Sequence, residues 1–203
     1  NAHQLTAVGG FVASERSVAA NSIHATGFGS AAIPSVNAGS IKTSTANTSR
    51  RRNSSFIGRL NYAYDDRYLA TANFRADAST VFANTDNPWG YFPSFSLGWR
   101  ISKEKFFTLD KVNELKLRLG WGAVGNDQTA DYASYGLVSP TAPYVIGGVV
   151  VPGTAPDSME NVNLRWETTR QSNIGLDIAL FNNRVLVTTD YYIKRTEDML
   201  LDR

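Results

Sequence analysis

Few residues in this chain have types that could do chemistry. Glu167 and Asp177 belong to one motif, which also contains Trp166, Asn173 and Gly175, and two carboxylates can act as general acid and base. No second catalytic group lies near them in the sequence. We therefore favour a structural interpretation, in which Trp166 anchors at a membrane interface and the carboxylates accept hydrogen bonds inside a lumen.

His3 and His24 are the only histidines, and cysteine is absent. The lack of cysteine excludes disulfides, thiolate metal sites and thiol catalysis. Two separated histidines make a weak metal site, so we expect neither a metal nor a cofactor. An outer-membrane enzyme remains an alternative, and it would need a serine beside one of these histidines on the same face of a barrel wall.

Aromatic residues are the better candidates for substrate binding. Trp89 and Tyr91 stand where a long connection enters a strand, and their flat faces suit sugar rings. The competing interpretation is an interfacial aromatic girdle with glycine and proline at the strand entry. Tyr132, Tyr135 and Tyr144 lie in a later connection and are further candidates for contact with substrate.

The elements that must position these residues are seven segments in which apolar and polar residues alternate. A period of two indicates β-strands, because successive side chains leave opposite faces. GRLNYAYDDRYLATANFR (58–75) contains parts of two of them. The predicted strands are 4–15, 55–64, 67–76, 92–101, 114–122, 168–181 and 184–195.

The two faces of these strands differ sharply in composition. One carries Tyr, Phe, Trp, Leu and Ile, whereas the other carries residues such as Arg59, Arg100 and Arg118. Each arginine would cost roughly 2–4 kcal/mol at the midplane of a bilayer. The apolar face is therefore expected to meet lipid, and the polar face a wet or protein-filled lumen.

Short and long connections alternate along the chain. Compact ones are expected at Asp65–Asp66, 102–113 and Asn182–Asn183, and long ones at 16–54, 77–91 and 123–167. Outer-membrane barrels have short periplasmic turns and long extracellular loops, so we assign the long connections to the extracellular side. Seven strands would leave two open edges, which lipid does not tolerate. We therefore expect residues 1–203 to be one partial barrel domain within a larger barrel.

The net charge of +2 gives no indication of a nucleic-acid partner. A soluble β-sandwich, either a carbohydrate-binding module or an adhesin, remains a second alternative. It predicts a packed apolar interior in place of a polar lumen, and its weakness is an aromatic face large enough to aggregate in water.

Several segments together resemble the SusC/RagA-like family of TonB-dependent outer-membrane transporters. They are RRNSSFIGRLNYAYDDRYLATANFRADAS (51–79), NPWGYFPSFSLGWRISKEKFF (87–107), LKLRLGWGAVGND (115–127) and NLRWETTRQSNIGLDIALFNNRVLVTTDYYIKRTEDML (163–200). The match is good from about residue 51 onward and thinner before it.

This resemblance implies an antiparallel meander within a barrel of about twenty-two strands, in the outer membrane of a Gram-negative bacterium. Such a protein is not an enzyme. It imports glycans or peptides, is lidded by a SusD-like substrate-binding lipoprotein, and is driven through a TonB complex. The family's plug domain and TonB box have no counterpart in these residues, so we expect this chain to supply only channel wall and extracellular rim.

Overall fold

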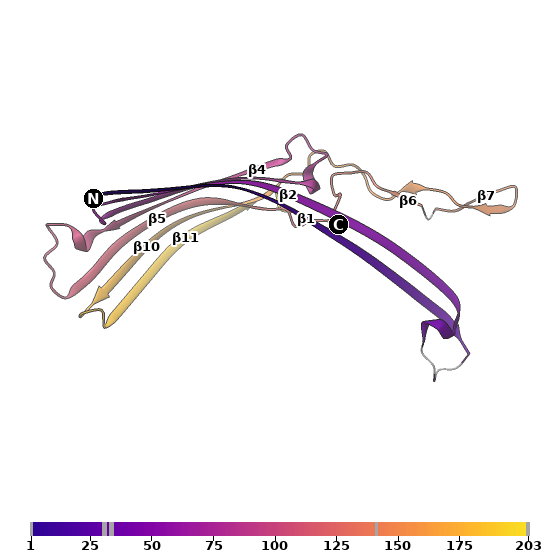
Figure 1. The fold of residues 1–203 in the computed structure, drawn as a ribbon, viewed down its shortest axis with the longest axis horizontal. Coiled ribbons are helices and arrows are strands. Elements are labelled where there is room, and N and C mark those ends of the chain that lie inside the picture. Colours follow the sequence, from indigo (N-terminus) through magenta and orange to yellow (C-terminus); the bar gives the residue numbers. More distant parts are fainter. Residues whose placement is uncertain (1, 30–31, 33–34, 141, 202–203) are drawn as a thin grey trace.

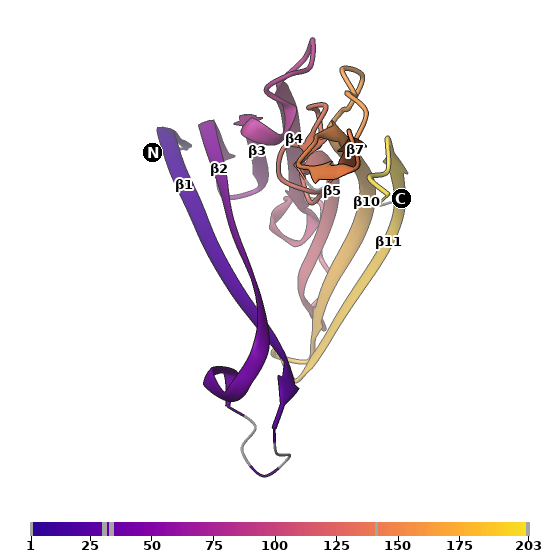
Figure 2. The same cartoon turned by 90° about the vertical axis from the view of Figure 1, so that its right-hand side faces the viewer.

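The chain forms one curved seven-stranded sheet in a computed structural model that describes residues 2–29, 32, 35–140 and 142–201. Its strand order is β1-β2-β3-β4-β5-β10-β11, and all neighbours run antiparallel. Figures 1 and 2 show the sheet curled like part of a cylinder wall. The strands are β1 (His3–Phe28), β2 (Gly39–Tyr64), β3 (Tyr68–Ser79), β4 (Trp89–Arg100), β5 (Val112–Asn126), β10 (Glu167–Leu180) and β11 (Val185–Glu197).

The remaining elements are short. Three 3-10 turns are η1 (Val36–Ala38), η2 (Thr80–Phe82) and η3 (Ile101–Lys103). Between β5 and β10, β6 (Val138–Ser139) pairs with β9 (Ala155–Pro156), and β7 (Tyr144–Ile146) pairs with β8 (Val149–Val151). None of the helical segments described is long and apolar enough to cross a bilayer.

The strand register confirms the predicted division into two faces. Trp99 pairs with Tyr68 and Leu117, which continues the apolar face across β3, β4 and β5. The adjacent register position places Arg118 between Gly98 and Gly175 on the opposite, polar face. Because pairing preserves the side to which each residue points, all seven strands contribute to the same two faces.

No second layer covers the apolar face in the part of the chain that is described. Leu97, Leu119 and Ile174 lie in the middle of the sheet, yet they remain 50%, 42% and 46% exposed. Buried hydrophobic residues are few and mostly small, and they are Ala76, Val81, Phe82, Phe92, Ala123 and Ala179. The sandwich alternative required a packed apolar interior and is therefore wrong.

Tight turns occur at both predicted dipeptides. Asp65 and Asp66 have φ of 50° and 51°, and Asn182 and Asn183 have φ of 56° and 63°. Short polar residues tolerate this left-handed conformation. Both connections are longer than the predicted dipeptides, because residues 65–67 separate the paired Tyr64 and Tyr68, and residues 181–184 separate the paired Leu180 and Val185. The compact connection expected at 102–113 begins with the 3-10 turn η3 and ends where β5 starts at Val112.

The long connection predicted at 16–54 is wrong over most of its length. β1 and β2 pair from His3↔Tyr64 to Phe28↔Gly39, and β3 joins β2 only from Asn53 onward. The outer halves of β1 and β2 therefore form a two-stranded ribbon beyond the sheet (Figure 1). The other two long connections are shorter than predicted at both ends, because β3, β5 and β10 extend into them and β4 begins at Trp89.

Candidate functional site

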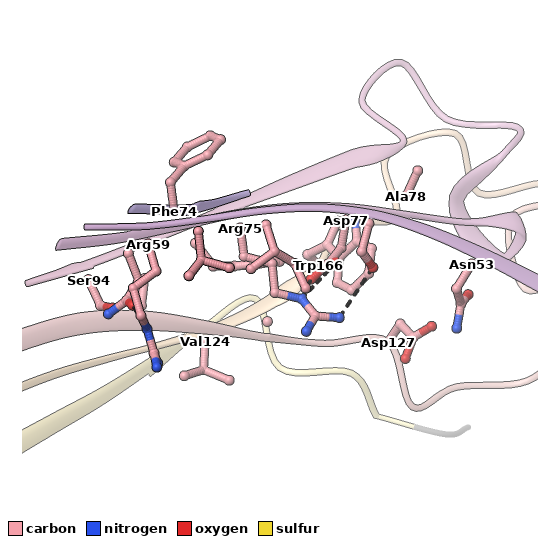
Figure 3. Close-up of a pocket in the computed structure, with 17 residues that line it drawn as sticks. Asn53, Arg59, Phe74, Arg75, Asp77, Ala78, Ser94, Val124, Asp127 and Trp166 are labelled. Atoms are coloured by element: carbon pink, nitrogen blue, oxygen red, sulfur yellow. Dashed lines mark hydrogen bonds and ion pairs between the residues drawn. The ribbon is translucent and has the colours of Figure 1, made fainter. Parts of the chain in front are cut away.

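The polar face is the concave face of the sheet and contains a hollow of about 730 Å³. Figure 3 shows Arg59, Arg75 and Ser94 on this side and Phe74 on the other. The hollow crosses β1 to β5 and extends to the loop that follows β5. Alternation along the strands thus brings these polar side chains together on one surface.

Hydrogen bonds within the wall fix the polar groups of the hollow. The Arg75 Nε–H donates to both carboxylate oxygens of Asp77, at 2.8 and 2.7 Å, and Nη2 donates to Ser55 Oγ at 3.2 Å. The Arg59 Nε–H donates to Asn73 Oδ1 at 2.7 Å, and the Asn73 amide donates to Ser94 Oγ at 3.0 Å. The Arg59 guanidinium is therefore held by the neighbouring strand β3, and that of Arg75 by Asp77 on its own strand and by Ser55 on β2.

Trp166 forms an aromatic cluster at the loop end of the hollow. Its ring lies 4.8 Å from that of Phe82 and 5.5 Å from that of Phe92, and its Nε1–H donates to Pro88 O at 3.2 Å. Trp166 lines the hollow together with Arg59 and Arg75. The girdle interpretation of Trp166 is therefore wrong, because its ring faces the concave side.

The cluster fills a gap between β4 and β5. Their paired register begins at Ser94↔Gly122, and the preceding residue is Pro93, which has no N–H to give to a ladder. Phe92 occupies the opening, and an added Cβ at Gly125 would lie 2.0 Å from its ring. Glycine at this position therefore allows the Phe92 ring to pack against β5.

The two carboxylates of the motif do not form a catalytic pair. Glu167 and Asp177 point to the same face but stand roughly 33 Å apart along β10, at about 3.3 Å per residue. Glu167 accepts hydrogen bonds from the Asn126 amide at 3.2 Å and from the Leu200 N–H at 3.1 Å. Asp177 accepts from Arg118 Nε and Nη2 at 2.8 and 2.9 Å. Both carboxylates are engaged in contacts that hold the wall together.

Glycines make room for polar side chains of neighbouring strands, with Gly175 of the motif beneath Arg118 and Gly120 beneath Asn173 of the motif. Arg118 on β5 reaches across Gly175 on β10 and makes an ion pair with Asp190 on β11 at 3.0 Å. A Cβ at Gly175 would lie 2.3 Å from Asp190 Oδ1 and 2.8 Å from Arg118 Cζ. Asn173 lies in the same way over Gly120, where a Cβ would come within 2.5 Å of its Oδ1.

Trp89 and Tyr91 lie on the convex face, away from the hollow. Their rings stack on Phe56 at 5.8 Å and on Phe74 at 6.2 Å. Both residues line a second hollow of about 520 Å³ at the loop end of β4. Their outward stacking favours the girdle interpretation, and their predicted contact with substrate stays a prediction.

The three loop tyrosines lie outside the concave hollow. Tyr132 and Tyr135 make an edge-on contact at 6.3 Å, and Tyr144 begins β7 with 52% of its surface exposed. Figure 1 shows β6 and β7 on an arm that leaves the loop end of the sheet. Their predicted role in binding substrate also stays a prediction.

Among the described residues, neither histidine makes a hydrogen bond to a serine. His3 Nδ1 lies 2.8 Å from the Tyr62 hydroxyl, and the His3 ring packs 4.8 Å from that of Tyr64. His24 is exposed on the ribbon opposite Thr43. Within the described part of the chain, no three histidine or acidic residues cluster as metal ligands.

Arg51 fixes the start of the loop that follows β5. It donates to Asp131 Oδ1 at 2.8 Å and to the Thr129 carbonyl at 2.6 Å. Hydrogen bonds from Ser49 and then from Arg51 lower the pKa of Asp131. The basic run at residues 50–52 is therefore engaged within the molecule, and Arg51 connects β2 to a loop that is distant in sequence.

Glu104 fixes the opposite, short-turn end. Its side chain is 9% exposed and accepts from the Tyr68 hydroxyl at 2.6 Å, Trp99 Nε1 at 2.9 Å and Arg67 Nη1 at 3.1 Å. The hydrogen bonds from Tyr68 and Trp99 are the main causes that lower the pKa of Glu104. The turn after η3 is thus bonded to two aromatic residues of the convex face.

Sequence reasoning missed the aromatic part of the hollow. Phe92 breaks the alternation, because it is an aromatic residue at a position of the polar face, and this irregularity was the available signal. The sequence around Phe82 gave no such signal, because its burial depends on η2 folding back onto Trp166.

Comparison with known proteins places the whole sheet in one family. Residues 3–203 match the family model described as TonB dependent receptor-like, beta-barrel. TonB-dependent receptor P26 of Formosa agariphila is 42% identical over 149 residues, which are 73% of this chain. TonB-dependent receptor SusC of Bacteroides thetaiotaomicron is 38% identical over 165 residues, which are 79% of this chain.

Solved structures agree with this result. The structure of the RagAB peptide transporter superposes with a TM-score of 0.84 over 99% of this chain at 26% identity, and the RagAB peptide importer in the 'closed-closed' state gives 0.80 over 97%. The chain spans 15% and 16% of the two curated relatives and 22% of each of these structures. These relatives and structures are named as TonB-dependent receptors and as a peptide transporter or importer.

Proposed function

The chain belongs to the SusC/RagA-like family of TonB-dependent receptors, and from this premise we propose that its sheet is part of the wall of an outer-membrane nutrient importer. The observation that carries the proposal is the two-faced sheet, which is mainly apolar on the convex side and mainly polar on the concave side wherever its strands lie outside the β1–β2 ribbon. A barrel wall needs this division, because one side faces lipid and the other a lumen.

The convex face has the composition that lipid contact requires. Leu97, Leu119 and Ile174 lie between two aromatic groups, with Trp99 and Tyr68 toward the short turns and Trp89 with Tyr91 toward the loops. Aromatic girdles mark the two interfaces of transmembrane barrels. In the proposed orientation the short turns face the periplasm and the arm and ribbon face the outside of the cell.

We propose that a SusD-like substrate-binding lipoprotein docks on the loop end, and the β7–β8 hairpin is the best candidate contact. Val145, Ile146, Val149 and Val150 are 59–67% exposed at its tip, and no charged residue occurs from 132 to 156. Exposed apolar patches of this kind mark interaction sites. The arm extends away from the convex belt (Figure 1), which favours a protein partner over lipid.

The proposed cargo is an oligopeptide or an oligosaccharide that passes along the concave face, with transport driven through a TonB complex. The solved structure that superposes with a TM-score of 0.84 is that of a peptide transporter. This similarity supports an oligopeptide as the cargo. Plug, TonB contact and the remaining strands would come from the rest of the parent protein.

Uptake by the full-length parent tests this function. We would express it with its partner lipoprotein in a strain that lacks other importers, and follow labelled oligopeptides and oligosaccharides with TonB present or deleted. We expect the parent in the outer-membrane fraction and TonB-dependent uptake of one cargo class. Uptake unaffected by TonB deletion, or a parent absent from the outer membrane, would contradict the proposal.

A further inference from the structure

Two arginines line the concave hollow, and of these Arg59 has no ion pair with a carboxylate of the described residues. Asp77 engages Arg75, and Asp127 and Asp131 both lie beside Arg51. Arg59 makes no ion pair with any described residue, and its hydrogen-bond partner among them is the neutral Asn73. The hydrogen bond to Asn73 uses Nε, so Nη1 and Nη2 are not engaged by the described part of the chain.

The surroundings of Arg59 are apolar as well as polar. Val8 is paired with Arg59 across β1 and β2 and is 57% exposed, and Ile57 is 36% exposed. Val124 projects into the same space from β5 and is 68% exposed (Figure 3). An exposed cation edged by branched aliphatic side chains suits a ligand that has a carboxylate next to an apolar group.

These features favour a peptide over a glycan. The aromatic residues that could stack on sugar rings, Trp89 and Tyr91, point to the other face of the sheet. Within the hollow, Phe92 is 7% exposed and Trp166 is packed between Phe82 and Phe92. Phe92 therefore offers little open ring surface and Trp166 is half-buried, whereas the aliphatic part of the hollow is more open.

We propose that Arg59 is the carboxylate-recognising residue of a peptide subsite, with Val8, Ile57 and Val124 contacting the adjoining apolar side chain. This inference rests on the proposed import function and adds the charge of the cargo. A guanidinium presents parallel N–H groups that match the two oxygens of a carboxylate. Fixation of Nε by Asn73 holds Arg59 in place before a ligand arrives.

Binding to the purified full-length parent and its partner lipoprotein tests the proposal. The probe is one N-acetylated pentapeptide of alanine and leucine, prepared as the free acid and as the C-terminal amide. We expect wild type to prefer the acid by about tenfold or more, which corresponds to 1.4 kcal/mol. Arg59→Gln should remove the preference, and Arg59→Lys should keep the charge but restore only part of it.

Lys116→Gln is the matched control, because it removes a cation from the polar face outside the hollow. It should keep the wild-type preference for the acid. A gel shift between heated and unheated samples would report the folded fraction of each variant. Equal binding of acid and amide to wild type, or a preference that survives Arg59→Gln, would overturn the proposal.

Two further outcomes also decide against it. A disaccharide with a uronate group that binds wild type more tightly than the peptide acid would show that the site takes an acidic glycan. Equal weakening of acid and amide by Arg59→Gln would show that Arg59 holds another part of the parent. Neither outcome contradicts the proposed import function, which is tested separately by TonB-dependent uptake and by the location of the parent.

Discussion

Replacing Gly175 by alanine should destabilise the wall through a side chain on another strand. The new Cβ would lie 2.3 Å from Asp190 Oδ1 and 2.8 Å from both Cζ and Nη2 of Arg118. These atoms are the ends of flexible side chains, so they can move without a shift of the backbone. Their movement would break the Arg118–Asp190 contact, which includes a 3.0 Å ion pair.

The magnitude follows from the exposure of the pair. The Arg118 and Asp190 side chains are 28% and 43% exposed, so losing their contact should cost about 1–2 kcal/mol, below the value for a fully desolvated pair. Alanine in a strand regains roughly 0.5 kcal/mol over glycine because it loses less conformational freedom on folding. The net loss for Gly175→Ala should therefore be about 1 kcal/mol.

A double-mutant cycle in the refolded parent barrel checks this reasoning. Unfolding free energies would be measured by urea titration in detergent for Gly175→Ala, Arg118→Ala and the double variant. In the Arg118→Ala background the contact with the guanidinium is absent, and Asp190 can move away from the new Cβ without losing its ion pair to Arg118. Gly175→Ala should therefore destabilise less in this background than in wild type. If Gly175→Ala destabilises equally in both backgrounds, the glycine does not serve the arginine and our explanation is wrong.

Three other changes test other parts of the molecule. Leu117→Arg should block membrane assembly of the parent, because an arginine at mid-bilayer costs about 2–4 kcal/mol. Arg118→Gln on the other face should still assemble. Indistinguishable shifts of the two variants on unheated gels would refute the face assignment. The pKa of Glu104 is lowered in the folded state, so its stabilising contribution is complete above the ordinary value of 4.5 and is lost as the pH falls. Trp99 fluorescence should therefore change on acidification in wild type and change less in Glu104→Gln. Val150→Asp should weaken co-purification of the partner lipoprotein by tenfold or more without changing the folded fraction, and unchanged recovery would exclude the β7–β8 tip as a contact.

The fold was predictable wherever one face of a strand is apolar. Segments such as 95–101 and 114–122 alternate so regularly that the face of each residue follows from the sequence, and the pairing of β4 with β5 agrees. The ribbon was not predictable in this way. Residues 16–28 and 39–51 are rich in Ser, Thr, Ala and Asn on both faces, so they give no period-two signal, and their strands exist because each provides the other with backbone hydrogen bonds.

The candidate site was predictable as a face but not as a hollow. Alternation placed Arg59 and Arg75 on the polar side, with Asp77 two residues from Arg75 on the same face of β3. The partner of Arg59 is Asn73, and this contact depends on how β2 pairs with β3. The inward turn of Trp166 depends on where β4 and β5 separate. Such long-range geometry is not encoded in local periodicity.

The glycines of the polar face have a consequence for the width of the conduit. Arg118 passes over Gly175 and Asn173 over Gly120, and in both places no Cβ holds the side chain away from the backbone. An arginine that lies flat contributes charge while adding little thickness to the wall. A surface built in this way can be strongly polar and still leave clearance for a bulky solute.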